Sequence, residues 1–189
     1  MSRLYLIRHG RPTATWGGAD DDPGLGEAGA MQARAARDWL LARPAGERPT
    51  RVVSSPLARC RETAAPTAAA LGVAVEIDPA VGEIPTPAAL PGGARGDWLR
   101  KAFAGTWAEI AGDLDYEAWR DAIVTSLTAR GDTAVFSHYV AINAVVSRLT
   151  GDQRVVAFRP DHASITVLDT DGTRLTLVAM GREDATDVL

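Results

Sequence analysis

The chain has 189 residues and a formal net charge of −4, with 46% hydrophobic and 23% charged residues. This composition is typical of a soluble globular protein and argues against disorder. The acidic balance argues against general nucleic-acid binding, which requires a basic face, so an anionic ligand would need a locally positive pocket. At this length we expect one domain, spanning residues 1–189.

Cysteine content and the first apolar run limit the cellular setting. Cys60 is the only cysteine, which excludes an intramolecular disulfide and a cysteine-rich metal site. The apolar run at residues 4–7 is too short for the apolar core of a signal peptide and far too short to cross a bilayer. We therefore expect a cytoplasmic protein with no membrane partner. The sequence does not indicate an oligomeric state.

The first half of the chain alternates strand and helix patterns. Residues 4–7 and then Val52-Val53 predict short buried strands, and residues 73–77 predict a third. Between the first two strands, residues 27–43 predict a helix with these residues at helical spacing: Ala28, Met31, Ala35, Trp39 and Ala42. Ser55 is expected to cap the next helix, with Pro56 at its first position.

The second half begins with an irregular segment. Prolines and glycines break regular structure over residues 82–96, and a helix capped by Asp97 is expected to follow. Long loops of this kind tend to be lids or walls, so we expect a lid at about residues 82–112. Helices are predicted around residues 116–127 and 142–149, with a strand at 133–136 between them. Strands at 164–168 and 174–179 flank Asp171-Gly172, a hairpin signal.

Strands that alternate with helices are typical of an α/β protein with a largely parallel sheet. The last two strands are expected to add an antiparallel edge. The sequence thus predicts a three-layer α/β/α sandwich.

Three predicted strands share one ending, in which an apolar run stops at polar residues. Arg8-His9-Gly10 follows the first strand, Ser54-Ser55 precedes Arg59 after the second, and Ser137-His138 follows the strand at 133–136. Ligands of open α/β sheets bind at the carboxyl ends of the strands. Parallel strands would therefore gather two arginines and two histidines at one edge.

This set of side chains suits a phosphoryl group. Arginine is permanently charged, and its planar fork matches phosphate oxygens. Arg59 would lie in the first turn of a helix, whose positive end also favours an anion. Gly10 would let the backbone approach the phosphate, and an unprotonated imidazole can attack phosphorus. Arg8 is thus expected to hold the phosphoryl group while His9 attacks it.

These residues resemble the histidine phosphatase superfamily, which includes the cofactor-dependent phosphoglycerate mutases. The similarity lies in Leu-Ile-Arg-His-Gly at residues 6–10, in Ser-Ser-Pro-Leu-Ala-Arg-Cys-Arg-Glu-Thr-Ala at 54–64 and in Phe-Ser-His at 136–138. Residues 23–33 resemble the link into the family's first helix. The three motifs occur in the family's order across essentially the whole chain, which implies the phosphoglycerate mutase-like fold.

The resemblance also implies roles. His9 would be phosphorylated, Arg8, Arg59 and His138 would bind the phosphoryl oxygens, and Glu83 would protonate the leaving oxygen and later activate water. No metal ion and no cofactor are implied. His9 must be neutral while His138 benefits from charge, so their pKa values are expected to differ, with an acceptor for the other nitrogen of His9.

The chain departs from the family's common pattern around this pocket. Arg11-Pro12 follows the glycine, Ile84-Pro85 follows Glu83, and Tyr139 follows His138. Arg11 and Tyr139 are further candidate substrate-binding residues, although a surface position for Arg11 and a packing role for Tyr139 and Trp16 also fit. His162, in a polar loop, is interpreted as structural or exposed, although an approach to the site also fits.

Rival chemistries find less support. Asp169-Thr170-Asp171-Gly172-Thr173 resembles the first motif of haloacid-dehalogenase-type phosphatases, but the chain that follows is too short for their other motifs. A cysteine phosphatase needs an arginine after five intervening residues, and the residue at that place after Cys60 is Pro66. A nucleotide-binding phosphate loop and a zinc-ligand pattern are absent from the sequence. Asp20-Asp21-Asp22 fits a solvated acidic loop better than a divalent cation site.

The sequence therefore predicts a metal-independent phosphomonoesterase that hydrolyses a small phosphorylated molecule through phosphohistidine. A mutase and a catalytically silent phospho-ligand binding protein are the alternatives. The substrate stays open among sugar phosphates, phosphorylated acids or alcohols, nucleotides and phosphoproteins.

Overall fold

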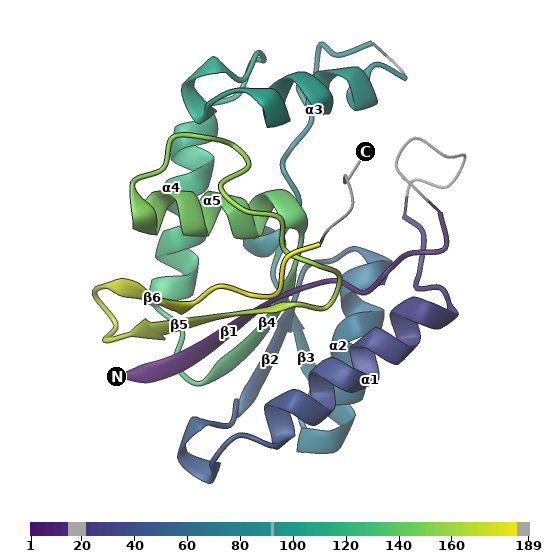
Figure 1. Cartoon of the computed structure of the whole chain (residues 1–189), viewed down its shortest axis with the longest axis vertical. Helices are drawn as coiled ribbons and strands as arrows, with labels where there is room; N and C mark the ends of the chain where they lie inside the picture. The colour runs from purple at the N-terminus through teal and green to yellow at the C-terminus, as the bar shows by residue number, and fades with distance from the viewer. Residues whose placement is uncertain (15–21, 92, 185–189) are drawn as a thin grey trace.

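The computed structural model describes residues 1–14, 22–91 and 93–184 (Figure 1). Trp16, Asp20 and Asp21 lie outside the described residues. Six strands form one sheet in the order β3-β2-β4-β1-β5-β6. They are β1 (Ser2–Arg8), β2 (Arg51–Ser54), β3 (Val75–Ile77), β4 (Thr133–Ser137), β5 (Ile165–Thr170) and β6 (Leu175–Ala179).

The sheet is parallel through β3, β2, β4 and β1, and β5 then pairs antiparallel with both β1 and β6. The expected parallel sheet with an antiparallel edge is confirmed. Gly172 has a φ of +88°, the left-handed conformation that the turn between β5 and β6 requires, and Asp171 N–H donates to the Arg174 carbonyl.

Helices cover both faces of this sheet. Helices α1 (Glu27–Leu41) and α2 (Ala58–Leu71) pack together on one face, whereas α4 (Tyr116–Thr128) and α5 (Tyr139–Thr150) cover the other (Figure 1). Helix α3 (Arg95–Ala104) lies beyond these layers, at the top of Figure 1. Short 3-10 turns, η1 (Ala45–Glu47), η2 (Pro79–Val81) and η3 (Trp107–Glu109), complete the described elements.

Strand β1 joins the two halves of the core because successive side chains point to opposite faces. Leu4 and Leu6 pack with the α4–α5 side, and Tyr5 and Ile7 pack with the α1–α2 side. All four are fully buried, and burial of such a side chain contributes about 1.5–3 kcal/mol. The centre of the sheet is thus fixed on both faces, which holds the end of β1 in place.

The apolar face expected for α1 is wrong. Its buried residues are Gly29, Ala33, Ala36 and Leu40, whereas Met31 is 55% and Trp39 37% exposed. Small residues face α2 because the two helices pack closely. A Cβ on Gly29 would lie 2.1 Å from the Arg11 carbonyl oxygen, so the chain leaving β1 also presses against this helix. The bulkier indole of Trp39 lies at the rim, where its ring meets that of Tyr5 edge-on at 5.8 Å.

Two expected helix caps are also wrong. Helix α2 begins at Ala58, beyond Ser55 and Pro56, and Ala58 N–H donates to both oxygens of the Asp22 carboxylate at 2.8 and 3.0 Å. Helix α3 begins at Arg95, because a turn in which Ala94 N–H donates to the Pro91 carbonyl starts it early. Asp97 therefore lies within the first turn, where it pairs with Arg100.

Candidate active site

The carboxyl ends of β1 and β4 bring His9 and His138 together. The strands are adjacent and parallel, with Arg8 opposite Ser137, so the residue after each strand emerges at the same level. The two imidazole centres are 5.3 Å apart at an interplanar angle of 61°, and the residues are 2% and 0% exposed. Burial on this scale is unusual for histidine and disfavours a charged imidazole.

His9 has one nitrogen fixed by the backbone. Its Nδ1 lies 2.8 Å from the carbonyl oxygen of Gly10, which can only accept, so Nδ1 carries the proton and Nε2 keeps its lone pair. This carbonyl is the acceptor expected from the sequence. Burial, together with the charges of Arg8 and Arg59 and the neighbouring His138, lowers the pKa of His9 well below its usual value. The imidazole is therefore neutral, as a nucleophile must be.

Gly10 is required by packing within the protein. A Cβ at this position would lie 2.6 Å from the Gly29 carbonyl oxygen at the start of α1. Its N–H donates to the hydroxyl of Thr63 on α2 at 2.9 Å. The glycine thus lets the chain cross between β1 and α1 at close range, which fixes the carbonyl that orients His9.

His138 shows the opposite tautomer from His9. Its Nδ1 lies 3.3 Å from Nη2 of Arg59, which can only donate, so Nδ1 accepts and Nε2 donates to the Ser55 hydroxyl at 2.8 Å. Ser55, expected as a helix cap, instead supports this histidine. The buried Sγ of Cys60 packs behind the ring at 3.3 Å from Nε2.

The charged state expected for His138 is not favoured by its surroundings. Burial and then the charges of Arg59, Arg8 and Arg95 lower the pKa of His138 well below its usual value, as for His9. The Oε2 atom of the Glu83 carboxyl is 3.8 Å from Nδ1 of His138, beyond hydrogen-bond reach. Cations therefore outweigh anions around this ring, and a ligand dianion would reverse that balance.

Glu83 follows η2 and points towards His138. Its side chain is 5% exposed; Oε1 accepts the N–H of Ile84 at 2.9 Å, while Oε2 is buried and has no hydrogen-bond partner among the described residues. Burial raises the pKa of Glu83, although the nearby arginines oppose the shift. A carboxyl whose pKa is raised holds its proton more readily, which suits proton donation.

Arg8 and Arg59 supply fixed positive charge and are 4% and 7% exposed. Arg59 lies in the first turn of α2, as expected. In both arginines Nε is buried without a hydrogen-bond partner among the described residues. Together with Oε2 of Glu83, three buried polar atoms around the two histidines thus await a polar partner, which a native protein seldom leaves unsatisfied.

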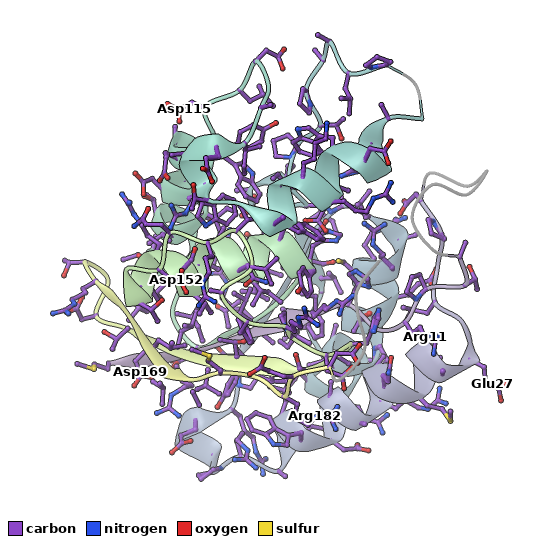
Figure 2. The ribbon with its side chains drawn as sticks, turned by 45° about the horizontal axis from the view of Figure 1, so that its top comes forward. Arg11, Glu27, Asp115, Asp152, Asp169 and Arg182 are labelled. Carbon is purple, nitrogen blue, oxygen red and sulfur yellow. The ribbon has the colours of Figure 1, made fainter. Side chains whose placement is uncertain are left out.

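The two further candidate substrate-binding residues, Tyr139 and Arg11, differ in burial and contacts. Tyr139, the first residue of α5, is 3% exposed and lies under Arg8, with the guanidinium carbon 5.0 Å from the ring centre. Burial raises the pKa of Tyr139 to about 12, so the phenol stays neutral. Arg11 is exposed on the loop between β1 and α1 (Figure 2), and its side chain makes no hydrogen bond or ion pair within the described part of the chain.

Three residues near the site were not among the predicted site residues. The His162 ring lies 5.8 Å from that of His9 and contacts Arg8, so the alternative in which it approaches the site is the correct one. Arg95 of α3 donates to the Ile84 carbonyl and acts electrostatically on Glu83 and His138. Asp22 lies 3.8 Å from Nη1 of Arg59. All three come from loops or from a helix start, where spacing carries no signal of a shared site.

One group of described residues has metal-ligand chemistry. Ligand atoms of Asp161, His162 and Asp184 lie within 4.8 Å of one another. However, Arg182 pairs with Asp161 at 3.3 Å and Arg8 contacts His162, so guanidinium groups already compete for the position that a cation would take.

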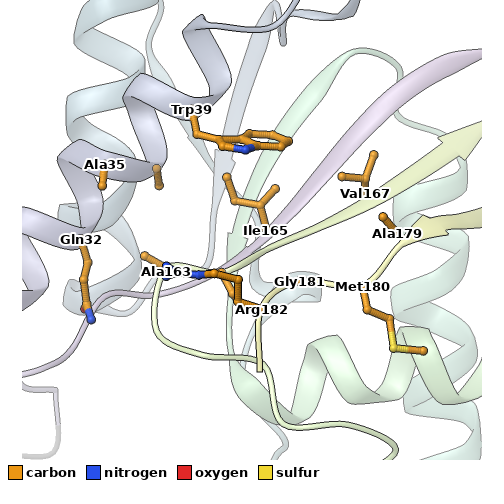
Figure 3. Close-up of a pocket in the computed structure, with 12 residues that line it drawn as sticks. Gln32, Ala35, Trp39, Ala163, Ile165, Val167, Ala179, Met180, Gly181 and Arg182 are labelled. Atoms are coloured by element: carbon orange, nitrogen blue, oxygen red, sulfur yellow. The ribbon is translucent and has the colours of Figure 1, made fainter. Parts of the chain in front are cut away.

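A pocket of about 420 Å³ lies elsewhere, between α1 and the β5–β6 pair (Figure 3). Trp39 forms one side and Ile165, Val167 and Met180 the other, so its lining is mainly apolar. None of the site residues predicted from the sequence lines it. The pocket is therefore separate from the histidine pair.

Fold and geometry together define the class: an α/β protein whose parallel strand ends carry two buried histidines, two arginines and an acidic residue. Residues 4–88, which include four of these five side chains, match the histidine phosphatase superfamily (branch 1). The uncharacterized Mycobacterium tuberculosis protein Rv0525 is 31% identical over 207 residues, covering 97% of this chain and 98% of that protein. The chain belongs to the histidine phosphatase superfamily, as the sequence motifs predicted.

Solved structures share the fold. Mycobacterial glucosyl-3-phosphoglycerate phosphatase Rv2419c superposes with a TM-score of 0.72 at 23% identity, covering 97% of this chain and 100% of that one. A phosphoserine phosphatase from Entamoeba histolytica, solved with 3-phosphoglyceric acid, gives a TM-score of 0.72 at 18% identity over 96% and 98% of the two chains. In the part of the chain that the structure describes, no helix combines the length and hydrophobicity needed to cross a bilayer.

Proposed function

We propose that the protein is a phosphomonoesterase that hydrolyses a small phosphorylated molecule through phosphohistidine at His9. One observation carries the proposal: His9 has its Nδ1 held by the Gly10 carbonyl and lies beside His138, with the charges of Arg8 and Arg59 acting on His9 and the Glu83 carboxyl 3.8 Å from His138. Guanidinium groups bind phosphoryl oxygens, and a protonated carboxyl serves the leaving oxygen.

The first step forms a P–Nε2 bond at His9 as the P–O bond to the leaving group breaks. Arg8 and Arg59 neutralise the charge on the equatorial oxygens. The carboxyl of Glu83 gives its proton to the leaving oxygen, which departs as an alcohol. The bound phosphoryl dianion places negative charge beside His138 and raises its pKa, which favours the protonated form expected from the sequence.

The second step returns the site to its starting state. The Glu83 carboxylate takes a proton from water, whose oxygen attacks phosphorus as the P–Nε2 bond breaks, releasing inorganic phosphate. No step uses a metal ion. The mutase alternative differs only in the acceptor, because a bound product would replace water.

We propose that the segment at about residues 82–112 is a lid and that it contributes to the choice of substrate. It supplies both Glu83 and Arg95, so it carries the proton donor and adds positive charge near the site. The names of the structural neighbours favour small phosphorylated acids and sugar derivatives, but they do not single out one substrate.

Two measurements test this function. The first is turnover of p-nitrophenyl phosphate in the presence of a chelator, and the second is the amount of acid-stable and acid-labile phosphate bound to the protein after rapid quenching. We expect chelator-resistant hydrolysis and an acid-labile phosphoenzyme in the wild-type protein. His9→Ala should lower turnover by roughly 10³-fold or more and abolish the phosphoenzyme while the protein stays folded. Full activity in purified His9→Ala protein would refute the nucleophile.

Assaying 3-phosphoglycerate isomerisation with and without bisphosphoglycerate separates the alternatives. Isomerisation that exceeds phosphate release would favour the mutase. A phosphoenzyme-free protein that binds phosphate but turns over neither substrate would be a silent binding protein.

A further inference from the structure

The guanidinium of Arg8 is held by the loop before β5, whose His162 ring also lies 5.8 Å from that of His9. Its Nη1 donates to the Pro160 carbonyl at 2.8 Å, and its Nη2 lies 3.2 Å from Nε2 of His162. The Tyr139 ring lies against the guanidinium at 5.0 Å. The remaining Nε is the buried atom without a partner among the described residues. Arg8 is thus fixed at its far end, with Nε left for a ligand.

The contact with His162 fixes the proton of that imidazole. An arginine nitrogen can only donate, so Nε2 of His162 must accept and Nδ1 must carry the proton. Burial and the adjacent Arg8 lower the pKa of His162 to about 4, so the ring is neutral near pH 7. A protonated ring could not accept this hydrogen bond, and its positive charge would be repelled by that of Arg8.

Several contacts hold the loop in the conformation that brings His162 to Arg8. The side-chain Oδ1 of Asn143, a fully buried residue of α5, accepts the N–H groups of Ala157 and Phe158 at 2.8 and 3.1 Å. Ala163 N–H donates to the His9 carbonyl at 3.3 Å. Ala163 itself has a φ of +53°, a left-handed conformation that is strained for alanine and persists only when surrounding contacts impose it.

We propose that His162 is a positioning residue that orients Arg8 for the phosphoryl group through a neutral imidazole acceptor. This inference rests on the proposed function, because it assigns Arg8 to phosphate. It adds a third histidine to the site, one that acts through Arg8 and does not touch the reacting atoms. Without this acceptor, Arg8 would keep its charge but lose part of its fixed direction, and phosphate would bind less tightly.

Two substitutions of similar length separate an acceptor from a packing group. His162→Gln retains an oxygen that can accept from Arg8, whereas His162→Met fills similar space without a good acceptor. Binding of inorganic phosphate is measured by isothermal titration calorimetry, alongside Tm and p-nitrophenyl phosphate kinetics. We expect His162→Met to weaken phosphate binding about tenfold and to raise KM similarly, and His162→Gln to stay within about threefold of wild type.

The outcomes distinguish this inference from the proposed function. The positioning role is overturned if wild-type and His162→Met protein bind phosphate equally well, or if both variants lose the same amount of phosphate affinity. In either case, turnover by the wild-type protein would still support the proposed phosphatase function. A wild-type protein that neither binds phosphate nor forms phosphoenzyme overturns both. Should His162→Met fail to fold, His162→Ser, too short to reach Arg8, takes its place with the same expected loss.

Discussion

The two sides of the candidate site are built differently. On the strand side, His9 and His138 follow β1 and β4, and each has a defined tautomer set by a backbone carbonyl or a guanidinium. On the side of the segment after β3, Glu83 follows a 3-10 turn, and one of its carboxyl oxygens has no partner within the described residues. The sheet thus fixes the two histidines, and the irregular segment supplies the carboxyl that we propose as the proton donor.

This contrast follows from what each side can satisfy internally. Strand register places the two histidines against fixed donors and acceptors, so their protons have one favourable position. Glu83 has only its neighbouring amide and distant charges, and burial without a partner favours its protonated form. A buried carboxyl kept protonated is suited to give up its proton when a leaving group needs it.

The largest effect in this comparison is expected from Glu83→Gln. The amide fills the same space but cannot deliver a proton, so hydrolysis of an alkyl phosphate should fall by roughly 10²- to 10⁴-fold. An aryl phosphate with a good leaving group should be slowed far less. Because the pKa of Glu83 is raised and its acid form is lost as pH rises through that value, the wild-type rate on alkyl phosphates should fall on the alkaline side.

Steady-state kinetics against both substrates from about pH 5 to pH 9 provide the measurement. The variant should lack the alkaline fall assigned to Glu83. Equal slowing of the two substrates, or an unchanged alkaline limb, would place the proton donor elsewhere on the molecule.

A smaller effect is expected where the two sides meet, at Asp22. Its carboxylate accepts both hydrogen bonds from Ala58 N–H and lies near Arg59, so it caps α2 and steadies the arginine. Asp22→Ala should cost about 1 kcal/mol, or about 2–4 °C in Tm, and should also raise KM a few-fold.

Asp115→Ala is the matched control. Asp115 caps α4 through Ala118 N–H at 2.9 Å, at the far end of the view in Figure 2 from Arg11, and no site residue contacts it. It should lower Tm by a similar amount and leave KM unchanged. If both variants change KM by the same factor, Asp22 acts only as a helix cap and does not steady Arg59.

The smallest effect is expected at Ala163, in the loop behind Arg8. Glycine adopts the observed φ of +53° without strain, so the substitution removes backbone strain from the folded state. This gain should offset the greater conformational entropy that glycine gives to the unfolded chain. Ala163→Gly should therefore change the free energy of unfolding by less than about 0.5 kcal/mol, whereas Ala122→Gly in the exposed face of α4 should cost about 1 kcal/mol. Chemical denaturation of the two variants tests this ordering; equal losses would show that Ala163 is not strained.

Much of the fold could be predicted because its signals are local. Runs of apolar residues predict strands at residues 4–7, 52–53 and 133–136, and these residues lie in β1, β2 and β4. The face of α1 was missed because close packing against α2 favours small residues over the bulkier Met31 and Trp39. The caps at Ser55 and Asp97 were missed for a related reason: His138 engages Ser55, and a preceding turn starts α3 before Asp97.

The sequence by itself determined the central chemistry of this protein: a parallel sheet must bring Arg8, His9, Arg59 and His138 to one edge, since strand ends are local and parallel strands share a direction. Only the tertiary structure decided which nitrogen of each histidine bears a proton, and that Ser55, Asp22 and His162 support the site. Those outcomes depend on hydrogen bonds between residues far apart in the chain, and residue spacing carries no information about such contacts.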